Sequence, residues 1–170
     1  MKPLIFFCIF LLNTTLSCKK HKNDADNPYG LPNASQNGAN VFACRINDQN
    51  YIAYNDINHI GASISNDTIL IGGRTKKPYY ESLLIQIKTG SAGVGTYTIN
   101  NNSFAEYITD SLCTGLVTSL YQFHAISGSI QLTKLDKTNK IVAGTFNLVI
   151  PVTNCDTLKI IDGRLDINYY

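Results

Sequence analysis

Residues 129–150, SIQLTKLDKTNKIVAGTFNLVI, are the stretch that decides the fold. Ile130 and Leu132 alternate with Gln131 and Thr133, and a polar cluster at residues 136–139 then interrupts the pattern. A two-residue period broken by turn-forming residues is typical of an antiparallel β-hairpin. In the second strand of this hairpin, the side chains expected to face the core are Val142, Gly144, Phe146, Leu148 and Ile150.

The same period recurs along most of the chain, and no window of helical length carries a 3.6-residue apolar stripe. We therefore predict an all-β fold, a single antiparallel β-sandwich or flattened barrel with meander connections. The period alone does not separate these two architectures. The other segments predicted to form strands are residues 41–46, 51–54, 69–71, 83–88, 96–99, 104–108 and 158–167.

Length and charge restrict the class of protein. The chain has 170 residues, 15% of them charged, and a formal net charge of +2. Apart from Lys19, Lys20 and Lys22, the basic residues are scattered, and no basic and aromatic stripe is present that could follow a phosphate backbone. We expect no nucleic-acid partner and a single β domain at residues 41–170.

The N-terminus has the pattern of an export signal. Lys2 precedes an apolar run of nine residues at 4–12, which is too short for a membrane-spanning helix and suits a signal peptide. Ser17-Cys18 resembles the end of a lipobox, in which the cysteine is acylated. We expect a signal peptide at residues 1–17 and a lipid anchor on Cys18; the alternative is a plain secretory signal with an incidental cysteine.

Residues 18–40 are expected to form the lipidated N-terminus and a flexible tether, because they are polar and contain Pro28, Gly30, Pro32 and Gly38. This organisation predicts a lipid-anchored protein of the cell envelope. We expect it at the outer membrane, on the periplasmic or the surface face. The membrane is then the first partner of the chain.

Three segments carry a family resemblance: residues 31–44 (LPNASQNGANVFAC), residues 128–146 from GSIQLTKLD to GTF, and residues 161–167 (IDGRLDI). Together they resemble a family of uncharacterised lipoproteins from Bacteroidota. The resemblance implies lipid anchoring and a β domain, and it implies no activity and no site residues. Residues 55–127 take no part in it.

The same motifs also predict local structure. Gly144 within a strand indicates a bulge or a close approach of two backbones. Asp162-Gly163-Arg164 indicates a bulge in the last strand, with Asp162 or Asp166 able to pair with Arg164 on the outer face.

Signatures of catalysis and of metal binding are sparse. The chain has His21, His59 and His124 and only two glutamates, Glu81 and Glu106, so few groups are available for acid–base chemistry. No paired His or Cys motif and no acidic calcium loop is present. We expect no enzyme, no metal and no cofactor; a cleft that brings His59 or His124 to Glu81 or Glu106 would favour an enzyme instead.

The cysteines left after export are Cys44, Cys113 and Cys155. In an oxidising compartment an odd number allows one disulfide and leaves one thiol free. Cys44 falls on the inward face of a predicted strand, whereas Cys113 and Cys155 lie in polar, loop-like sequence. We predict a disulfide between Cys113 and Cys155.

Three triplets of Asp, Ser or Thr, and an apolar residue resemble O-glycosylation sites of exported Bacteroidota proteins. They predict modification at Thr68, Ser111 and Thr157. The alternative is that these pairs are simply good turn formers.

The function that we expect is a non-enzymatic interaction or ligand-binding module, with a protein or glycan partner. Tyrosines favour it, because they stack on sugars and anchor interfaces: Tyr79, Tyr80, Tyr97, Tyr107 and Tyr121. The alternative is that they are ordinary strand residues of a β domain. The alternative is a barrel-type carrier of a small apolar ligand. A central cavity would favour the carrier, and a packed core would favour the binding module.

Overall fold

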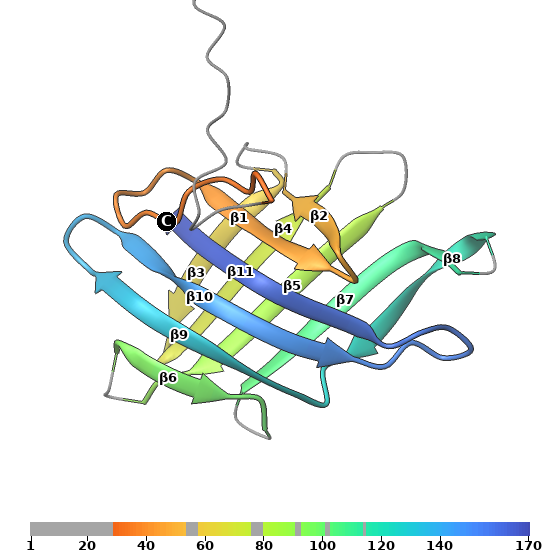
Figure 1. The fold of residues 1–170 in the computed structure, drawn as a ribbon. Helices are drawn as coiled ribbons and strands as arrows, with labels where there is room; N and C mark the ends of the chain where they lie inside the picture. The colour runs from red at the N-terminus through yellow and green to blue at the C-terminus, as the bar shows by residue number, and fades with distance from the viewer. Residues whose placement is uncertain (1–28, 54–57, 76–79, 91–92, 101–102, 114) are drawn as a thin grey trace, which may run out of the picture. The chain divides into compact units, whose positions relative to one another are not determined.

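The computed structural model describes residues 29–53, 58–75, 80–90, 93–100, 103–113 and 115–170. All regular structure in these residues is β-sheet (Figure 1). Within them, no helix has the length and apolar character needed to span a membrane. The strands are β1 (Val41–Ile46), β2 (Gln49–Ile52), β3 (Ile60–Ser65), β4 (Thr68–Arg74), β5 (Glu81–Lys88), β6 (Gly95–Thr98), β7 (Ser103–Leu112), β8 (Gly115–His124), β9 (Ser127–Asp136), β10 (Ile141–Ile150) and β11 (Leu158–Asn168).

The strands form two antiparallel sheets that face each other (Figure 1). The six-stranded sheet has the order β2-β1-β11-β10-β9-β6, and the five-stranded sheet has the order β3-β4-β5-β7-β8. Most neighbouring strands are also consecutive in sequence, as in a meander. The pairing of β1 with β11 brings the first and last strands of the chain side by side. The fold is a sandwich, and the flattened-barrel alternative is wrong.

The hairpin at residues 129–150 is confirmed as β9 and β10. Its turn is held by Asp136, whose Oδ1 accepts hydrogen bonds from the backbone N–H groups of Thr138 and Asn139 at 3.1 and 2.9 Å. The expected inward row of β10 is buried throughout. Gly144 shows why a small residue is needed there, because a Cβ atom at this position would overlap the carbonyl oxygen of Gln131.

The core lies between the two sheets and is filled mainly by branched aliphatic side chains. Phe42 of β1 and Phe146 of β10 stack with ring centroids 5.3 Å apart. A Cβ atom at Gly73 of β4 would overlap the Phe42 ring, so the two sheets are in close contact at this point. The largest side chains with under 2% exposure are Phe42, Phe146, Ile69, Ile71, Leu83, Ile85, Ile87, Ile130, Leu132, Leu148, Ile150 and Ile160.

The predicted bulge in the last strand is confirmed at Asp162 and Gly163. The register with β10 shifts there, and Asp162 takes a positive φ of 53°. The expected pairing of an aspartate carboxylate with Arg164 is wrong; Arg164 Nε contacts Asp162 through the backbone carbonyl oxygen, at 3.4 Å. Asp162 instead approaches Arg45 at 3.8 Å, and Arg164 donates to the carbonyl oxygen of Pro32 at 2.9 Å.

Three segments differ from the sequence prediction. β7 is twice as long as the predicted strand at 104–108, and β3 and β8 are additional strands. The compact β unit begins at Leu31, which is 2% exposed, and not at residue 41. Residues 31–40, expected in the flexible tether, therefore belong to the domain, and we call them the N-terminal strap. The signal peptide, Cys18 and His21 lie outside the described residues.

Candidate functional site

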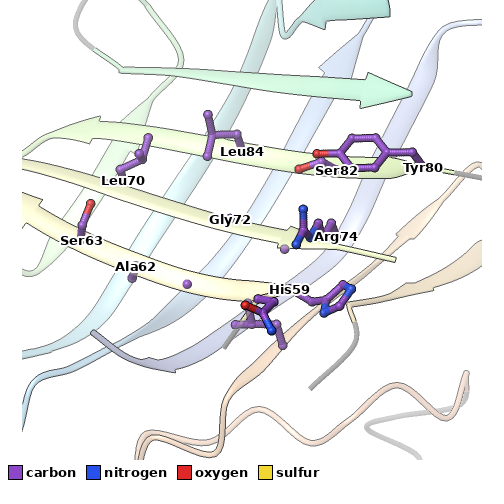
Figure 2. A pocket seen from close by; sticks show the side chains of 13 residues that line it. His59, Ala62, Ser63, Leu70, Gly72, Arg74, Tyr80, Ser82 and Leu84 are labelled. Carbon is purple, nitrogen blue, oxygen red and sulfur yellow. The ribbon is translucent and has the colours of Figure 1, made fainter. Parts of the chain in front are cut away.

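A groove of about 390 Å³ crosses the outer face of the five-stranded sheet, over β3, β4 and β5 (Figure 2). Its floor is low because Gly61 of β3 and Gly72 of β4 are directly opposite in the ladder. A Cβ atom added at Gly61 would meet no atom within 4 Å, so the space above it is open. Two glycines side by side thus create a depression without disturbing the core beneath.

The polar residues gather at one end of this groove (Figure 2). Arg74 pairs with Ser82 across the β4–β5 ladder, and its backbone N–H donates to the carbonyl oxygen of His59 at 2.8 Å. Tyr80, two residues before Ser82, lies beside them. Toward the other end the groove is lined by Ser63 and Leu70. One groove therefore offers hydroxyls, an aromatic ring, a guanidinium group and an apolar strip.

Among the described residues that line the groove, Arg74 is the one strongly basic residue. Its side chain is half-buried, and its Nε atom is buried without a hydrogen-bond partner. Within the described part of the chain, no carboxylate or carbonyl pairs with this guanidinium group. A half-buried, unpaired cation is costly, because it has lost part of its hydration and gained no partner.

The carboxylates of neighbouring strands are engaged elsewhere. Glu81 accepts a hydrogen bond from the hydroxyl of Tyr107 at 2.7 Å, inside the sandwich. Asp110 accepts from the backbone N–H of Tyr80 at 2.8 Å. Glu106 lies 3.5 Å from His124 on the next strand. None of these acids lines the groove.

The histidines and glutamates considered for catalysis do not share a cleft. Glu106 and His124 are opposite each other in the β7–β8 ladder, so their contact is a cross-strand pair on a sheet face. The His124 side chain is 63% exposed. His59 lines the groove, while Glu81 turns to the interior. The described residues contain no group of three or more His, Cys, Asp or Glu that could hold a metal ion.

A second polar cluster is buried between the sheets. Tyr51 donates to the carbonyl oxygen of Gly73 at 2.6 Å, near the Tyr107–Glu81 pair. Burial raises the pKa of Tyr51, and burial together with Glu81 raises the pKa values of Cys44 and Tyr107. Cys44 is a free thiol and is fully buried, so it is held in the unreactive protonated form.

The disulfide between Cys113 and Cys155 is confirmed. It joins the turn after β7 to the loop before β11, and so links the two sheets at one end of the sandwich. Beside it lies a cavity of about 280 Å³, lined in part by Leu112, Val152 and Tyr107. This cavity is at the end of the sandwich, and the middle between the sheets is filled by the buried aliphatic core.

The N-terminal strap is held by Asp166 of β11, which is 1% exposed. The Asp166 carboxylate accepts from the Ser35 hydroxyl at 2.6 Å and from the backbone N–H groups of Asn37, Gly38 and Ala39 at 2.7–3.1 Å. Burial alone would raise the pKa of Asp166, but these hydrogen bonds outweigh it and hold the pKa below its usual value.

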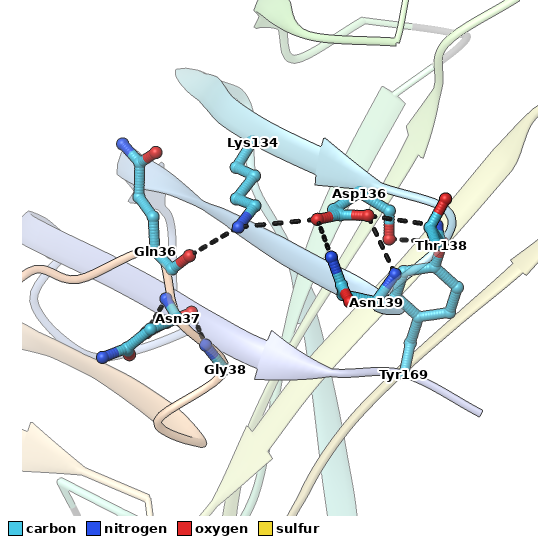
Figure 3. A network of polar contacts seen from close by, with 9 residues as sticks. Gln36, Asn37, Gly38, Lys134, Asp136, Thr138, Asn139 and Tyr169 are labelled. Carbon is cyan, nitrogen blue, oxygen red and sulfur yellow. Dashed lines mark hydrogen bonds and ion pairs between the residues drawn. The ribbon is translucent and has the colours of Figure 1, made fainter.

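A second contact ties the strap to β9 (Figure 3). Lys134 donates to the carbonyl oxygen of Gln36 at 2.9 Å and lies 3.6 Å from Asp136. Two of the segments that carry the family resemblance, residues 31–44 and 161–167, therefore meet at the strap, and the third supports it. Their shared pattern therefore includes residues that make a structural contact.

The tyrosines expected on one surface are spread over the molecule. Of these tyrosines, Tyr80 is the only described one that lies in the groove; Tyr107 is buried, and Tyr97 of β6, in the six-stranded sheet, donates to the carbonyl oxygen of Gly93 at 2.7 Å. Tyr121 is 41% exposed and stacks on Phe123. Tyr79 lies outside the described residues.

The three predicted O-glycosylation residues lie in different settings. Thr157 is exposed in the loop before β11, whereas Thr68 at the start of β4 and Ser111 near the end of β7 are half-buried. Modification at these positions stays a prediction, and Thr157 is the most accessible of the three.

Sequence reasoning missed Arg74 and the glycine pair at Gly61 and Gly72. The signal was weak: a single arginine at a strand end, and two glycines whose pairing depends on the register of a hairpin.

Comparison with protein families matches residues 39–165 to a domain of unknown function, DUF6252. No curated protein and no solved structure matches the chain. The family match covers well over half of the 170 residues. The chain therefore belongs to the DUF6252 family.

Proposed function

We propose that this protein is a non-enzymatic binding module of the cell envelope and that the sheet-face groove holds a glycan strand. The observation that carries the proposal is the open floor at Gly61 and Gly72 beside the ring of Tyr80. Sugar rings present an apolar face and a hydroxyl edge. An aromatic ring with nearby hydroxyls matches both, and an open groove admits a chain that continues in both directions.

The chemistry of the lining favours binding over hydrolysis. Glycoside hydrolysis commonly uses two carboxylates that flank the scissile bond. The described residues that line the groove include no Asp and no Glu. Ser63 and Ser82 supply hydroxyls suited to hydrogen bonding with sugar, and Leu70 and Leu84 supply apolar contact.

The experiment that tests the groove fills it. Gly61 has ordinary backbone geometry and open space above it, so Gly61→Phe places a ring in the groove without a clash. Ser65→Phe, on the same strand but outside the groove, is the matched control. We expect Gly61→Phe to weaken binding in a glycan array or by calorimetry by about tenfold or more, and Ser65→Phe to leave binding unchanged. Equal binding by both variants would contradict the proposed site.

A carrier of a small apolar ligand is the second candidate, favoured by the cavity beside the Cys113–Cys155 disulfide. At about 280 Å³ it is at the lower limit of small-molecule pockets. Native mass spectrometry of the purified chain would detect a retained apolar ligand. Val152→Trp, which fills the cavity, would then abolish that retention, whereas Gly61→Phe would not.

We further propose that acylated Cys18 holds the domain at the cell envelope, on the outer membrane. The Cys113–Cys155 disulfide supports export, because such bonds persist in oxidising compartments. Cys18→Ala is expected to move the protein from the membrane fraction to the soluble fraction. Membrane retention by that variant would contradict lipid anchoring.

A further inference from the structure

We infer that the groove selects an acidic glycan and that Arg74 binds its carboxylate. This inference rests on the proposed function, since it names the class of ligand for the same groove. It starts from the unpaired guanidinium group at the polar end of the groove.

Arg74 is positioned by the sheet itself. It ends β4, where its backbone is bonded to His59 on one side and paired with Ser82 on the other. Its Nε atom is shielded from solvent, which leaves the terminal amino groups as the donors that a ligand can reach. The backbone of Arg74 is therefore fixed by the sheet, and its side chain lines the groove.

Among the described residues, no acid balances the charge of the groove. The acids of the adjoining strands are engaged with Tyr107, with the backbone of Tyr80 and with His124, and no described acid lines the groove. An anionic group on the ligand would supply the missing counter-charge. The planar fork of arginine binds a carboxylate through two parallel hydrogen bonds, and this geometry gives specificity as well as strength.

The rest of the groove limits what can carry that carboxylate. Tyr80 and Ser82 lie beside Arg74, so the acid should be attached to a ring that contacts Tyr80 and offers hydroxyls to Ser82. A uronic acid unit has this combination. Neighbouring sugar units would then extend over Gly61 and Gly72 toward Ser63.

The test compares binding of the full chain to oligomers of galacturonic, glucuronic and mannuronic acid with binding to the same oligomers as methyl esters, in which the charge is removed and a methyl group is added. We expect at least one acid to bind about tenfold or more tightly than its ester, with a preference that falls as NaCl is raised. Arg74→Gln should remove the preference, and Arg74→Lys should keep part of it. Lys88→Gln, an exposed cation of β5 outside the groove, is the matched control and should keep all of it.

The outcomes separate the two ideas. Equal binding of acid and ester, blocked by Gly61→Phe but unaffected by Arg74→Gln, would overturn the acidic preference and leave the proposed function standing. An acidic preference that survives Arg74→Gln and disappears in Lys88→Gln would also overturn the role of Arg74. Binding of no uronic-acid oligomer, as acid or as ester, would overturn this inference, whereas the proposed function is decided separately by the glycan array with Gly61→Phe and Ser65→Phe.

Discussion

Asp166 is the residue on which the N-terminal strap depends. A carboxylate that is 1% exposed is unfavourable unless its oxygens are bonded, and here four donors from residues 35–39 surround it. Three of these donors are consecutive backbone N–H groups, so the strap wraps around one side chain. Charge-assisted bonds of this kind are roughly twice as strong as neutral ones.

Asp166→Asn should therefore destabilise the domain by about 2 kcal/mol at neutral pH. The folded pKa of Asp166 lies below its ordinary value of 3.8, so the stabilisation is present above that value and is lost as the pH falls through the depressed folded pKa. Urea unfolding should show a large difference in unfolding free energy between wild type and variant at pH 7, and a smaller difference at about pH 2. Asp156→Asn, at an exposed loop residue, should show little change at either pH; a pH-independent difference at Asp166 would contradict the assignment.

At this scale the sequence predicts residues whose neighbours are close in the chain or whose chemistry is distinctive. The polar, loop-like sequence around Cys113 and Cys155 predicts their disulfide, because Cys44 falls on an inward strand face. The place of Gly144 within a strand predicts the close approach of two backbones. The sequence does not predict that Asp166 holds the N-terminal strap or that Arg74 lines a groove, because both roles depend on segments that fold beside these residues. Asp166 accepts a hydrogen bond from Gly38, which is 128 residues away in the chain. Alternation indicates on which face of a strand a residue lies, but not how deeply another segment buries it.

Strands with strict alternation were predicted most closely. β5 and the middle of β9 alternate, as does β10 from Gly144 onward, and their expected inward residues are buried. β8 was missed because both of its faces carry mixed side chains, with Tyr121 and Phe123 on one and Leu120 and Gln122 on the other. The polar composition of the strap predicts a tether, because composition alone gives no sign of the hydrogen bonds that the strap makes with β9 and β11.

The disulfide is an element-scale device, since it fixes the β7–β8 turn of one sheet to the β10–β11 loop of the other. It spans 42 residues, for which the chain-entropy model gives about 4 kcal/mol. Cys113→Ser, Cys155→Ser and the double variant should lose the same amount of unfolding free energy, because each removes the same bond. Dithiothreitol should lower the wild type to their level and leave the variants unchanged. A double variant clearly less stable than both single variants would contradict this.

At the scale of the whole molecule, the choice between sandwich and barrel depends on how the edge strands are paired. A hydrophobic period does not contain that information, because an inward face looks the same in both architectures. β2 and β6 are the edges of one sheet, and β3 and β8 are the edges of the other. Among the described residues, the interior between the sheets is packed mainly with aliphatic side chains.

The two sheets interlock where Phe42 of β1 lies over Gly73 of β4. Phe42→Ala should leave a cavity and cost about 3–5 kcal/mol of unfolding free energy. Gly73→Ala should destabilise the domain for the opposite reason, because its Cβ atom would overlap the Phe42 ring and lie 2.9 Å from the Cβ of Ala53.

Combining Gly73→Ala with Phe42→Ala should then cost less than the sum of the two single losses, with a coupling of about 1 kcal/mol in a double-mutant cycle. Gly61→Ala, on the outer face of the adjacent strand with open space above it, is the matched control and should show no coupling to Phe42→Ala. Strict additivity at Gly73 would mean that the sheets can slide apart at this point. In that case β4 would not be held in a fixed position by the core, and neither would Gly72 and Arg74, which line the groove on the outer face of the same strand.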